Sequence, residues 1–253
     1  MSELEGRTVL LTGASKGIGA EIAAGLGRAG AHVVAHYGND RAGAEAATAE
    51  IPAVRKLLVG ADLFDAAETA RVWDEATTWR PVDVLVNNAA VMEDTPFDGT
   101  LEEWHTGWER AWRINVQASA DLTRAAVAHF VARGGGVLIT ISSWVAQRGS
   151  GGTGLAAYAA SKAAVKAFTQ TVARHYGSRG VLAYVIAPGV VATQLSQRAA
   201  AMFGGEEAVR STLAMGEMVP PGEVADLVVW LADGHARHLT GSTLDVNGAT
   251  YVR

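Results

Sequence analysis

A glycine-rich turn between an apolar run and an amphipathic segment constrains the fold of this chain more than any other feature. Residues 7–11 form a short apolar run, which predicts a strand, and residues 12–19 follow with the sequence TGASKGIG. Apolar residues then recur at Ile22, Ala23 and Leu26, which predicts a helix. Glycines let a backbone approach a pyrophosphate, whose charge is bound by the exposed N–H groups of a helix start. The strand–turn–helix context predicts a phosphate site, with a plain glycine turn as the alternative, because the spacing is GxxxGxG rather than GxGxxG.

Strands and helices continue to alternate to the end of the chain. Helical segments separate further predicted strands at 31–35, 56–59, 84–86, 137–141, 181–186 and 243–246. This alternation predicts an α/β fold of the Rossmann type, a doubly wound parallel sheet of about seven strands with helices on both faces. No linker, repeat or low-complexity segment divides the 253 residues, so we expect one domain over 1–253.

Composition argues against several classes of function. The formal charge is −5 with no basic run, which disfavours nucleic acid and anionic membranes as partners. The chain has no cysteine, so disulfides, thiol nucleophiles and thiolate metal sites are excluded, and its seven histidines form no HxH or HExxH pattern. We therefore expect no metal. The N-terminus lacks the apolar region of a signal peptide, and no apolar run reaches the ~18 residues that span a bilayer, so we expect a soluble, cytoplasmic protein.

The end of the second predicted strand bears on which nucleotide would bind. An NAD-preferring site usually has an acidic residue there, which binds the ribose 2′-hydroxyl. We align Tyr37 with that position, so no acid would repel a 2′-phosphate, and Lys16 and Arg41 add positive charge nearby. The pattern favours NADP and leaves NAD possible. The plain alternative is that Lys16 and Arg41 are solvated surface charges.

Tyr158 and Lys162 have the spacing of two residues on one face of a helix, one turn apart. A free phenol titrates near pH ~10, so it transfers protons poorly at neutral pH unless a cation stabilises its anion. Lys162 is placed to supply that cation. Taken alone, the pair also fits a half-buried tyrosine beside a solvated lysine on an alanine-rich helix.

Together these stretches resemble the short-chain dehydrogenase/reductase superfamily over almost the whole chain, and within it the 3-oxoacyl-acyl carrier protein reductases. Residues 12–19 match the family's TGxxxGxG loop, and residues 87–90 match its NNAG element with alanine in place of the last glycine. Residues 188–193 match its PGxxxT segment. The family's catalytic tetrad is matched by Asn115, Ser143, Tyr158 and Lys162.

The resemblance implies a role for each member of the tetrad. Tyr158 would exchange a proton with the substrate oxygen while hydride moves to or from the carbon. Lys162 would lower the pKa of Tyr158 and hold the nicotinamide ribose, and Ser143 would hydrogen-bond the substrate oxygen. Asn115 would hold a water that links Lys162 to solvent. Ser142 is an alternative to Ser143, which we prefer because it lies further out at the carboxyl edge of the sheet.

The resemblance also implies a set of cofactor contacts and some departures. Tyr184 and Asn247 differ from the family's usual residues, and the gap between Ser143 and Tyr158 is long, which weakens transfer of a particular substrate. The implied cofactor contacts are Gly13, Ser15, Lys16, Gly17, Ile18, Gly19, Tyr37, Asp62, Leu63, Asn88, Ala89, Tyr158, Lys162, Pro188, Gly189 and Thr193.

These observations predict an NADP-dependent oxidoreductase that transfers hydride between nicotinamide and a ketone or secondary alcohol. An NAD-dependent alcohol or polyol dehydrogenase is the alternative among enzymes. A non-catalytic dinucleotide-sensing protein is the alternative from another class, and the complete tetrad argues against it because a sensor does not need Tyr158 and Lys162 in register.

Two expectations concern the surroundings of the site. We expect a substrate lid around 193–218 and an apolar substrate, because that segment and the neighbouring loop carry Trp144, Met202, Phe203, Met215 and Met218. The alternative is that these side chains only pack the lid. We also expect a homo-oligomer, a tetramer by resemblance, whose interface includes the apolar stripe of Trp104, Trp108 and Trp112 where these do not face the core.

Overall fold

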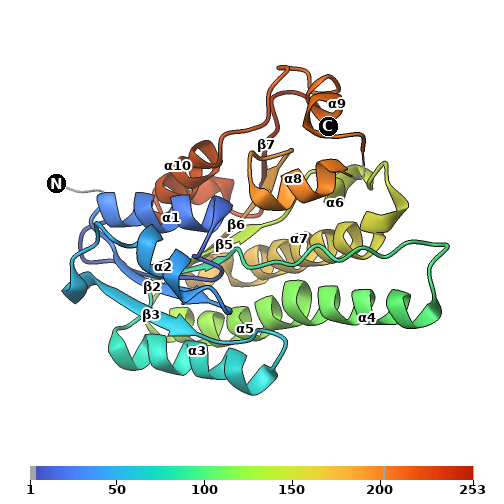
Figure 1. Ribbon diagram of the computed structural model, residues 1–253. Helices are drawn as coiled ribbons and strands as arrows, with labels where there is room; N and C mark the ends of the chain where they lie inside the picture. The colour runs from blue at the N-terminus through green and yellow to red at the C-terminus, as the bar shows by residue number, and fades with distance from the viewer. Residues whose placement is uncertain (1–3, 202, 253) are drawn as a thin grey trace.

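A seven-stranded parallel sheet forms the centre of the protein (Figure 1). The structure is a computed structural model that describes residues 4–201 and 203–252. Neighbouring strands pair in parallel in the order β3-β2-β1-β4-β5-β6-β7. The predicted doubly wound sheet is confirmed, and each predicted strand agrees with an observed one to within two residues at either end. The strands are β1 (Thr8–Leu11), β2 (His32–Tyr37), β3 (Lys56–Gly60), β4 (Val84–Asn87), β5 (Gly136–Ile141), β6 (Val181–Pro188) and β7 (Thr243–Val246).

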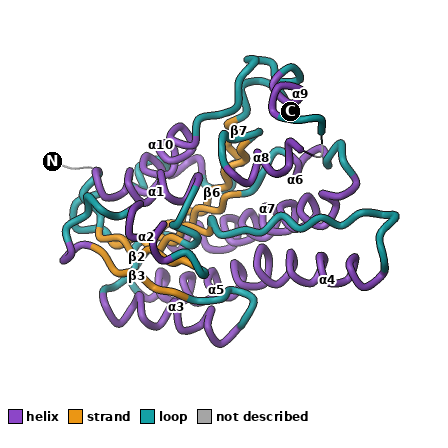
Figure 2. Tube along the Cα trace, viewed as in Figure 1, coloured by secondary structure: helices purple, strands orange, loops and turns teal. Residues whose placement is uncertain are grey.

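Helices cover both faces of this sheet (Figures 1 and 2). One face carries α1 (Gly17–Arg28) and α10 (Pro221–Ala232), and the other carries α3 (Ala66–Trp79), α5 (Ala118–Ala132) and α7 (Ala156–Tyr176). None of the helices in the described part of the chain has the length and apolarity to cross a membrane. The remaining α-helices are α2 (Arg41–Ala47), α4 (Leu101–Ala111), α6 (Val145–Arg148), α8 (Gln194–Ala201) and α9 (Glu206–Arg210), and a π-helical turn, η2 (Trp112–Gln117), joins α4 to α5.

The strands are nearly continuous apolar runs because both of their faces are covered. Successive side chains of β1 point to opposite faces of the sheet. Val9 and Leu11 lie in the core beneath α1 and α10, whereas Leu10 lies in the core against the α3, α5 and α7 layer, and all three are fully buried. Burial of each such side chain stabilises the fold by about 1.5–3 kcal/mol. The sheet therefore holds the loops at its carboxyl edge on a rigid base.

The starts of α3 and α4 differ in how they are capped. At α4 the Thr100 hydroxyl accepts a hydrogen bond from the Glu103 N–H, and the Glu103 carboxylate accepts one from the Thr100 N–H, a complete capping box. At α3 the Asp65 carboxylate caps the helix, but the Glu68 carboxylate accepts from the Asp62 N–H at 2.6 Å instead of closing the box. The capping box at Asp65 and Glu68 is thus only half formed, because Glu68 binds the loop that follows β3.

Strands β1 and β4 lie side by side although β2 and β3 separate them in the sequence. The chain leaves β1 toward one edge of the sheet and leaves β4 toward the other, so the two loops diverge at their carboxyl ends. A crevice forms at such a reversal of strand order, and ligands of open α/β sheets bind there. The topology therefore places the expected site above the carboxyl ends of β1 and β4.

Candidate active site

A cavity of about 750 Å³ runs along the carboxyl edge of the sheet. Its walls come from the loops after six of the strands, from α7 and from the segment that leads into α8. Tyr37 and Asn115 are the two predicted site residues that do not line it. The predicted site residues that do line it are Gly13, Ser15, Lys16, Gly17, Ile18, Gly19, Asp62, Leu63, Asn88, Ala89, Ser143, Tyr158, Lys162, Pro188, Gly189 and Thr193.

The glycine turn between β1 and α1 has a backbone that other residues would strain. Gly13 and Gly17 have φ of +71° and +56°, in the left-handed region that glycine adopts without strain. Gly19 leaves no room for a side chain, because a Cβ there would overlap the carbonyl of Gly13 and lie 2.6 Å from the Asn88 amide nitrogen. Within the described chain no side chain caps the start of α1 at Lys16. The turn therefore presents an uncapped helix start to the cavity, which is the geometry that binds a phosphate.

Thr12 and Asn88 fasten this turn to the loop that follows β4. The Thr12 hydroxyl accepts hydrogen bonds from the N–H groups of Asn88 and Ala89, each at 3.0 Å. The Asn88 amide donates to the carbonyls of Thr12 and Gly13 at 2.9 and 3.1 Å. The two walls of the crevice are thus joined by four hydrogen bonds. Asn88, which was predicted to contact the cofactor, thus also joins the glycine turn to the loop after β4.

The region beyond β2 differs from the sequence expectation. The Tyr37 ring lies over Gly60 of the neighbouring strand, where a Cβ would be 2.8 Å from the ring, and so Tyr37 does not line the cavity. Arg41 pairs with Glu45 at 2.8 Å, beside Tyr37, and does not line it either. Lys16 is exposed and does line it. Tyr37 and Arg41 thus lie outside the cavity wall, and a contact of either with a cofactor stays a prediction.

Residues that the sequence analysis did not select replace Tyr37 in the wall. Gly38, Asn39 and Asp40 follow β2 and line the cavity, and the Asp40 carboxylate accepts a hydrogen bond from the Gly43 N–H at the start of α2. His36 also lines it. The sequence could have indicated this part of the wall, because Gly38, Asn39 and Asp40 are turn-forming residues directly after the predicted strand.

Ser143, Tyr158 and Lys162 meet where β5 ends against α7. The Ser143 hydroxyl hydrogen-bonds the Tyr158 hydroxyl, and the Lys162 ammonium donates to the Ile141 carbonyl at 2.8 Å. Desolvation raises the pKa of Tyr158 to about 12, against the opposing effect of the Ser143 hydrogen bond. Desolvation also lowers the pKa of Lys162 to about 8. Tyr158 is thus protonated at neutral pH, with its hydroxyl at the cavity.

The pKa of Tyr158 differs in direction from the sequence expectation. Lys162 was expected to lower it, but its ammonium bonds the Ile141 carbonyl and lies 5.8 Å from the centroid of the Tyr158 ring. Removal of the phenolate from water outweighs the favourable contacts of the hydroxyl. The expected lowering is therefore not found in this structure.

The two adjacent serines have different partners. The Ser142 hydroxyl is buried and donates to the Lys162 carbonyl at 2.8 Å, which fixes α7 against the end of β5. The Ser143 hydroxyl accepts a long, 3.4 Å bond from the Val145 N–H and faces Tyr158. This difference in partners supports Ser143 over Ser142 as the serine that contacts a substrate.

Asn115 lies within the π-helical turn and holds two elements together. Its side-chain oxygen accepts from the Val91 N–H at 2.8 Å, and its amide donates to the Val91 carbonyl and the Ser161 hydroxyl, both at 2.9 Å. Ser161 in turn donates to the Tyr158 carbonyl at 2.7 Å. A π-turn displaces one residue from helical register, as often happens near functional sites. The role of Asn115 in holding a water stays a prediction.

The apolar side chains expected beside the substrate are not the ones found in the cavity wall, whose apolar lining includes Met92 and Leu195 instead. Met202 lies outside the described residues. Trp144, Phe203, Met215 and Met218 do not line the cavity. Phe203 packs on Gly152, Met215 packs on Gly248 and Met218 is buried. From the expected lid, Gln194, Leu195 and Ser196 line the cavity in addition to Thr193.

A polar pair on the other side of the cavity was not anticipated. Glu93, from the loop after β4, and Arg110, from α4, both line the cavity and form an ion pair at 2.8 Å. Nothing in the sequence pattern distinguishes either from a solvated surface charge. The loop that carries Glu93 passes along α7 (Figure 2), where Thr95 binds the Gly154 carbonyl and accepts a bond from the Ala157 N–H.

Comparison with known proteins gives consistent similarities over the whole chain. A family profile described as enoyl-(acyl carrier protein) reductase matches residues 13–249. The 3beta-hydroxysteroid dehydrogenase 1 of Eggerthella lenta is 34% identical over 97% of this chain and 94% of its own length. The 3-oxoacyl-acyl-carrier-protein reductase FabG of Escherichia coli is 32% identical over 98% of both chains. A putative NAD(P)-dependent gluconate 5-dehydrogenase from Beutenbergia cavernae, crystallised with NADP at low occupancy, superimposes with a TM-score of 0.88 at 33% identity over 99% of both chains.

Proposed function

Because the chain belongs to the short-chain dehydrogenase/reductase family of NAD(P)-dependent dehydrogenases and reductases, we propose that it is an NADP-dependent oxidoreductase acting on a ketone or secondary alcohol. One observation carries the proposal. A single cavity connects the uncapped start of α1 with the hydroxyls of Ser143 and Tyr158. A dinucleotide bound with its phosphates at α1 would extend along the carboxyl edge of the sheet toward Tyr158.

The residues of the cavity fit such a cofactor. Gly19 leaves a close approach that a side chain would block, and Gly13 and Gly17 hold the turn in a conformation that other residues disfavour. Asp62, Leu63 and the loop after β4 line the rest of the edge. When bound, the nicotinamide supplies the hydride and the protein supplies position and a proton.

The proton would come from Tyr158. A tyrosine with a pKa of about 12 is protonated at neutral pH, so it holds the proton that a carbonyl oxygen would take up in the reductive direction. Ser143, hydrogen-bonded to Tyr158, would donate to the same oxygen as negative charge develops there. Lys162, whose ammonium is already fixed by the Ile141 carbonyl, would hold the nicotinamide ribose.

We also propose that the whole chain acts as one catalytic domain and that 193–218 form a lid over the substrate. Thr193 begins this segment and lies against the glycine turn, since a Cβ on Gly17 would be 3.1 Å from the Thr193 methyl group. An isolated parallel bridge between Val191 and Val219 closes the base of the segment. A segment anchored at both ends next to the cofactor turn is suited to cover a bound substrate.

The reaction can be tested with a panel of ketones and alcohols and both nicotinamide cofactors, followed at the nicotinamide absorbance. We expect reduction or oxidation of at least one compound. Dinucleotide binding without turnover of any compound would support the non-catalytic sensor instead.

Cofactor choice is a sharper prediction. We expect kcat/KM for NADPH to exceed that for NADH, because Lys16 is the cation of the glycine turn and lines the cavity. Lys16→Ala should lower the ratio of kcat/KM for NADPH to kcat/KM for NADH by roughly 5-fold, because one exposed charge pair contributes about 1 kcal/mol to binding. Lys166→Ala removes a lysine outside the cavity wall and should leave the ratio unchanged. A wild-type preference for NADH would contradict the assignment.

The Glu93–Arg110 ion pair in the cavity wall supports the polyol alternative as a second candidate for the substrate. Glu93 and Arg110 offer an acceptor and donors to hydroxyl groups, while the apolar residues expected there do not line the cavity. We therefore expect a ketose to be used better than an aryl ketone or a 3-oxoacyl thioester. Glu93→Gln should reduce kcat/KM for the ketose and leave that for the aryl ketone unchanged. Higher kcat/KM for the aryl ketone in the wild type would restore the apolar expectation.

We propose that the protein is a homo-oligomer, with a tetramer as the expected state. Trp104 and Trp108 are half-buried, while Trp112, Phe97 and Leu101 are 46%, 70% and 75% exposed around α4. Large apolar side chains exposed together are typical of an interface. Sedimentation at micromolar concentration should show a species larger than the monomer, and Trp112→Glu should shift it toward smaller species. A wild-type monomer would contradict this proposal.

A further inference from the structure

His36 is a buried side chain to which the proposed reaction gives no role. It is the penultimate residue of β2, is 2% exposed and lines the cavity. Its Nδ1 lies 3.2 Å from the Gly13 nitrogen, and its Nε2 lies 3.0 Å from the Ala61 carbonyl oxygen. The imidazole therefore spans the space between the glycine turn after β1 and the segment after β3.

The partners of the two ring nitrogens determine the tautomer. The Gly13 N–H can only donate, so Nδ1 accepts, and the Ala61 carbonyl can only accept, so Nε2 carries the proton. Both nitrogens are then satisfied in the neutral ring. Burial lowers the pKa of His36, with a smaller lowering by Arg71, against opposing effects of the Ala61 hydrogen bond and Asp62. The neutral form that the geometry requires is thus the one the environment favours.

Both partners belong to the proposed cofactor site. Gly13 opens the glycine turn, and Ala61 directly precedes Asp62 and Leu63, which line the cavity. The backbone of β2 makes parallel contacts, since the His36 carbonyl accepts from the Ala14 N–H at 2.8 Å and the Tyr37 carbonyl accepts from the Ala61 N–H at 3.0 Å. The imidazole adds one side-chain bond to each of these two junctions.

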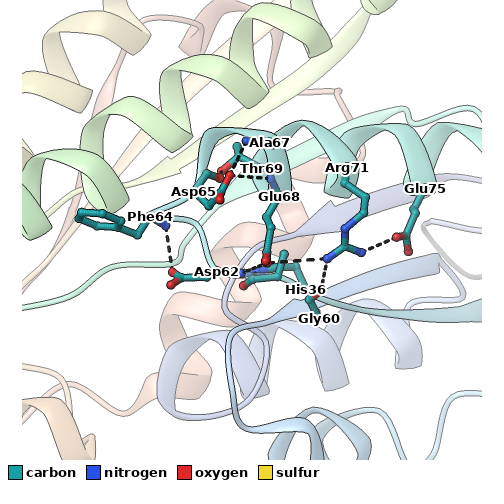
Figure 3. A network of polar contacts seen from close by, with 11 residues as sticks. His36, Gly60, Asp62, Phe64, Asp65, Ala67, Glu68, Thr69, Arg71 and Glu75 are labelled. Atoms are coloured by element: carbon teal, nitrogen blue, oxygen red, sulfur yellow. Dashed lines mark hydrogen bonds and ion pairs between the residues drawn. The ribbon is translucent and has the colours of Figure 1, made fainter.

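The segment after β3 is held from its other side by charged residues of α3 (Figure 3). The Glu68 carboxylate accepts from the Asp62 N–H, and the Arg71 guanidinium donates to the Gly60 carbonyl at 2.7 Å. Both side chains are about 45% exposed, so water competes for these bonds. His36 is the buried contact in this network, and it alone among these three side chains also reaches the glycine turn.

We propose that His36 is a positioning residue for the dinucleotide, one that fixes the glycine turn and the Ala61–Leu63 segment relative to each other through its two ring nitrogens. The proposal rests on the proposed function in that the dinucleotide binds in this cavity. His36 contacts no reacting atom in it. Loss of either bond frees one segment of the site before the cofactor arrives, and ordering that segment then reduces affinity.

Three substitutions separate the two bonds. His36→Phe keeps a ring and removes both bonds, His36→Asn keeps an acceptor near the position of Nδ1, and His36→Gln keeps a donor near that of Nε2. We expect His36→Phe to raise the Kd for NADPH about tenfold, the scale of one or two net hydrogen bonds, with kcat at saturating NADPH unchanged. His36→Asn and His36→Gln should each recover part of the affinity. His175→Phe, at an exposed position of α7, is the control.

A second measurement keeps this proposal separate from the proposed function. Amide hydrogen exchange of the ligand-free protein should be about tenfold faster in His36→Phe at residues 12–17 and at residues 60–63, and unchanged in the central strands. His36→Asn should keep the wild-type exchange rate at residues 12–17, and His36→Gln should keep it at residues 60–63. If His36→Phe does not fold, these two variants decide the matter. The proposal is overturned if His36→Asn and His36→Gln both exchange at the wild-type rate at residues 12–17 and at residues 60–63. If the wild-type protein binds no dinucleotide, only the proposed function is overturned.

Discussion

Tyr158→Phe should lower kcat at least ~10²-fold while the Kd for NADPH stays near that of the wild type, because the substitution removes a general acid and keeps the ring. The phenol is protonated at neutral pH through burial, and its hydroxyl is hydrogen-bonded to Ser143 at the cavity. Phenylalanine fills the same space. Steady-state turnover with the best substrate of the panel, together with NADPH fluorescence titration, measures the two quantities separately.

Tyr176→Phe is the matched control for this variant. Tyr176 lies on the same helix α7, does not line the cavity and packs against His175 and Arg179. We expect its kcat and its Kd for NADPH to equal those of the wild type. Near-normal turnover of Tyr158→Phe would remove Tyr158 from the proton-transfer role.

Lys162→Met should reduce both quantities, kcat by at least ~10²-fold and affinity for NADPH about tenfold, since a charged hydrogen bond to the ribose is worth about 1.5 kcal/mol or more. The buried ammonium is fixed by the Ile141 carbonyl in the cavity wall. Methionine matches the length of the side chain and carries no charge. Lys166→Met, one turn further along α7 and outside the cavity wall, should change neither quantity.

The charge of Lys162 also predicts a pH profile. Desolvation lowers the pKa of Lys162 to about 8 in the folded protein, below the value of an exposed lysine. The ammonium is therefore present below pH 8 and is lost as the pH rises through 8. We expect kcat/KM for reduction to fall above that pH in the wild type, with Tyr158 still protonated there. A profile that is level up to pH 10 would contradict a required charge on Lys162.

The effect of the same Lys162 titration on the stability of the fold has the opposite direction: stability rises with pH where activity falls. The unfolded chain holds the Lys162 proton more tightly than the folded one, because the folded pKa is the lower of the two. The resulting cost to the folded state is complete below pH 8 and disappears as the pH rises through the unfolded value of ~10.4. An alkaline loss of activity near pH 8 therefore cannot come from unfolding caused by this group.

Local sequence pattern sufficed for the fold, and the motifs shared with the family predicted about half of the residues that line the cavity. Apolar strands buried on both faces, a glycine turn and helix starts such as Thr100 and Glu103 are determined by residues close together in the sequence. Parallel strands with right-handed connections then place all the carboxyl-end loops at one edge. This is why residues as far apart as Gly13, Ser143 and Thr193, which the family resemblance implied for one site, line one cavity.

Only the tertiary structure decided where individual side chains point. Tyr37 turns over Gly60 because that glycine of a neighbouring strand leaves the room, and Glu68 leaves its capping box because the Asp62 N–H is within reach. The bonds of Asn115 to Val91 and of His36 to Gly13 likewise join segments that are separate in the sequence. A sequence pattern records the period of a strand or helix, but the partner of a polar side chain is set by what packing brings beside it.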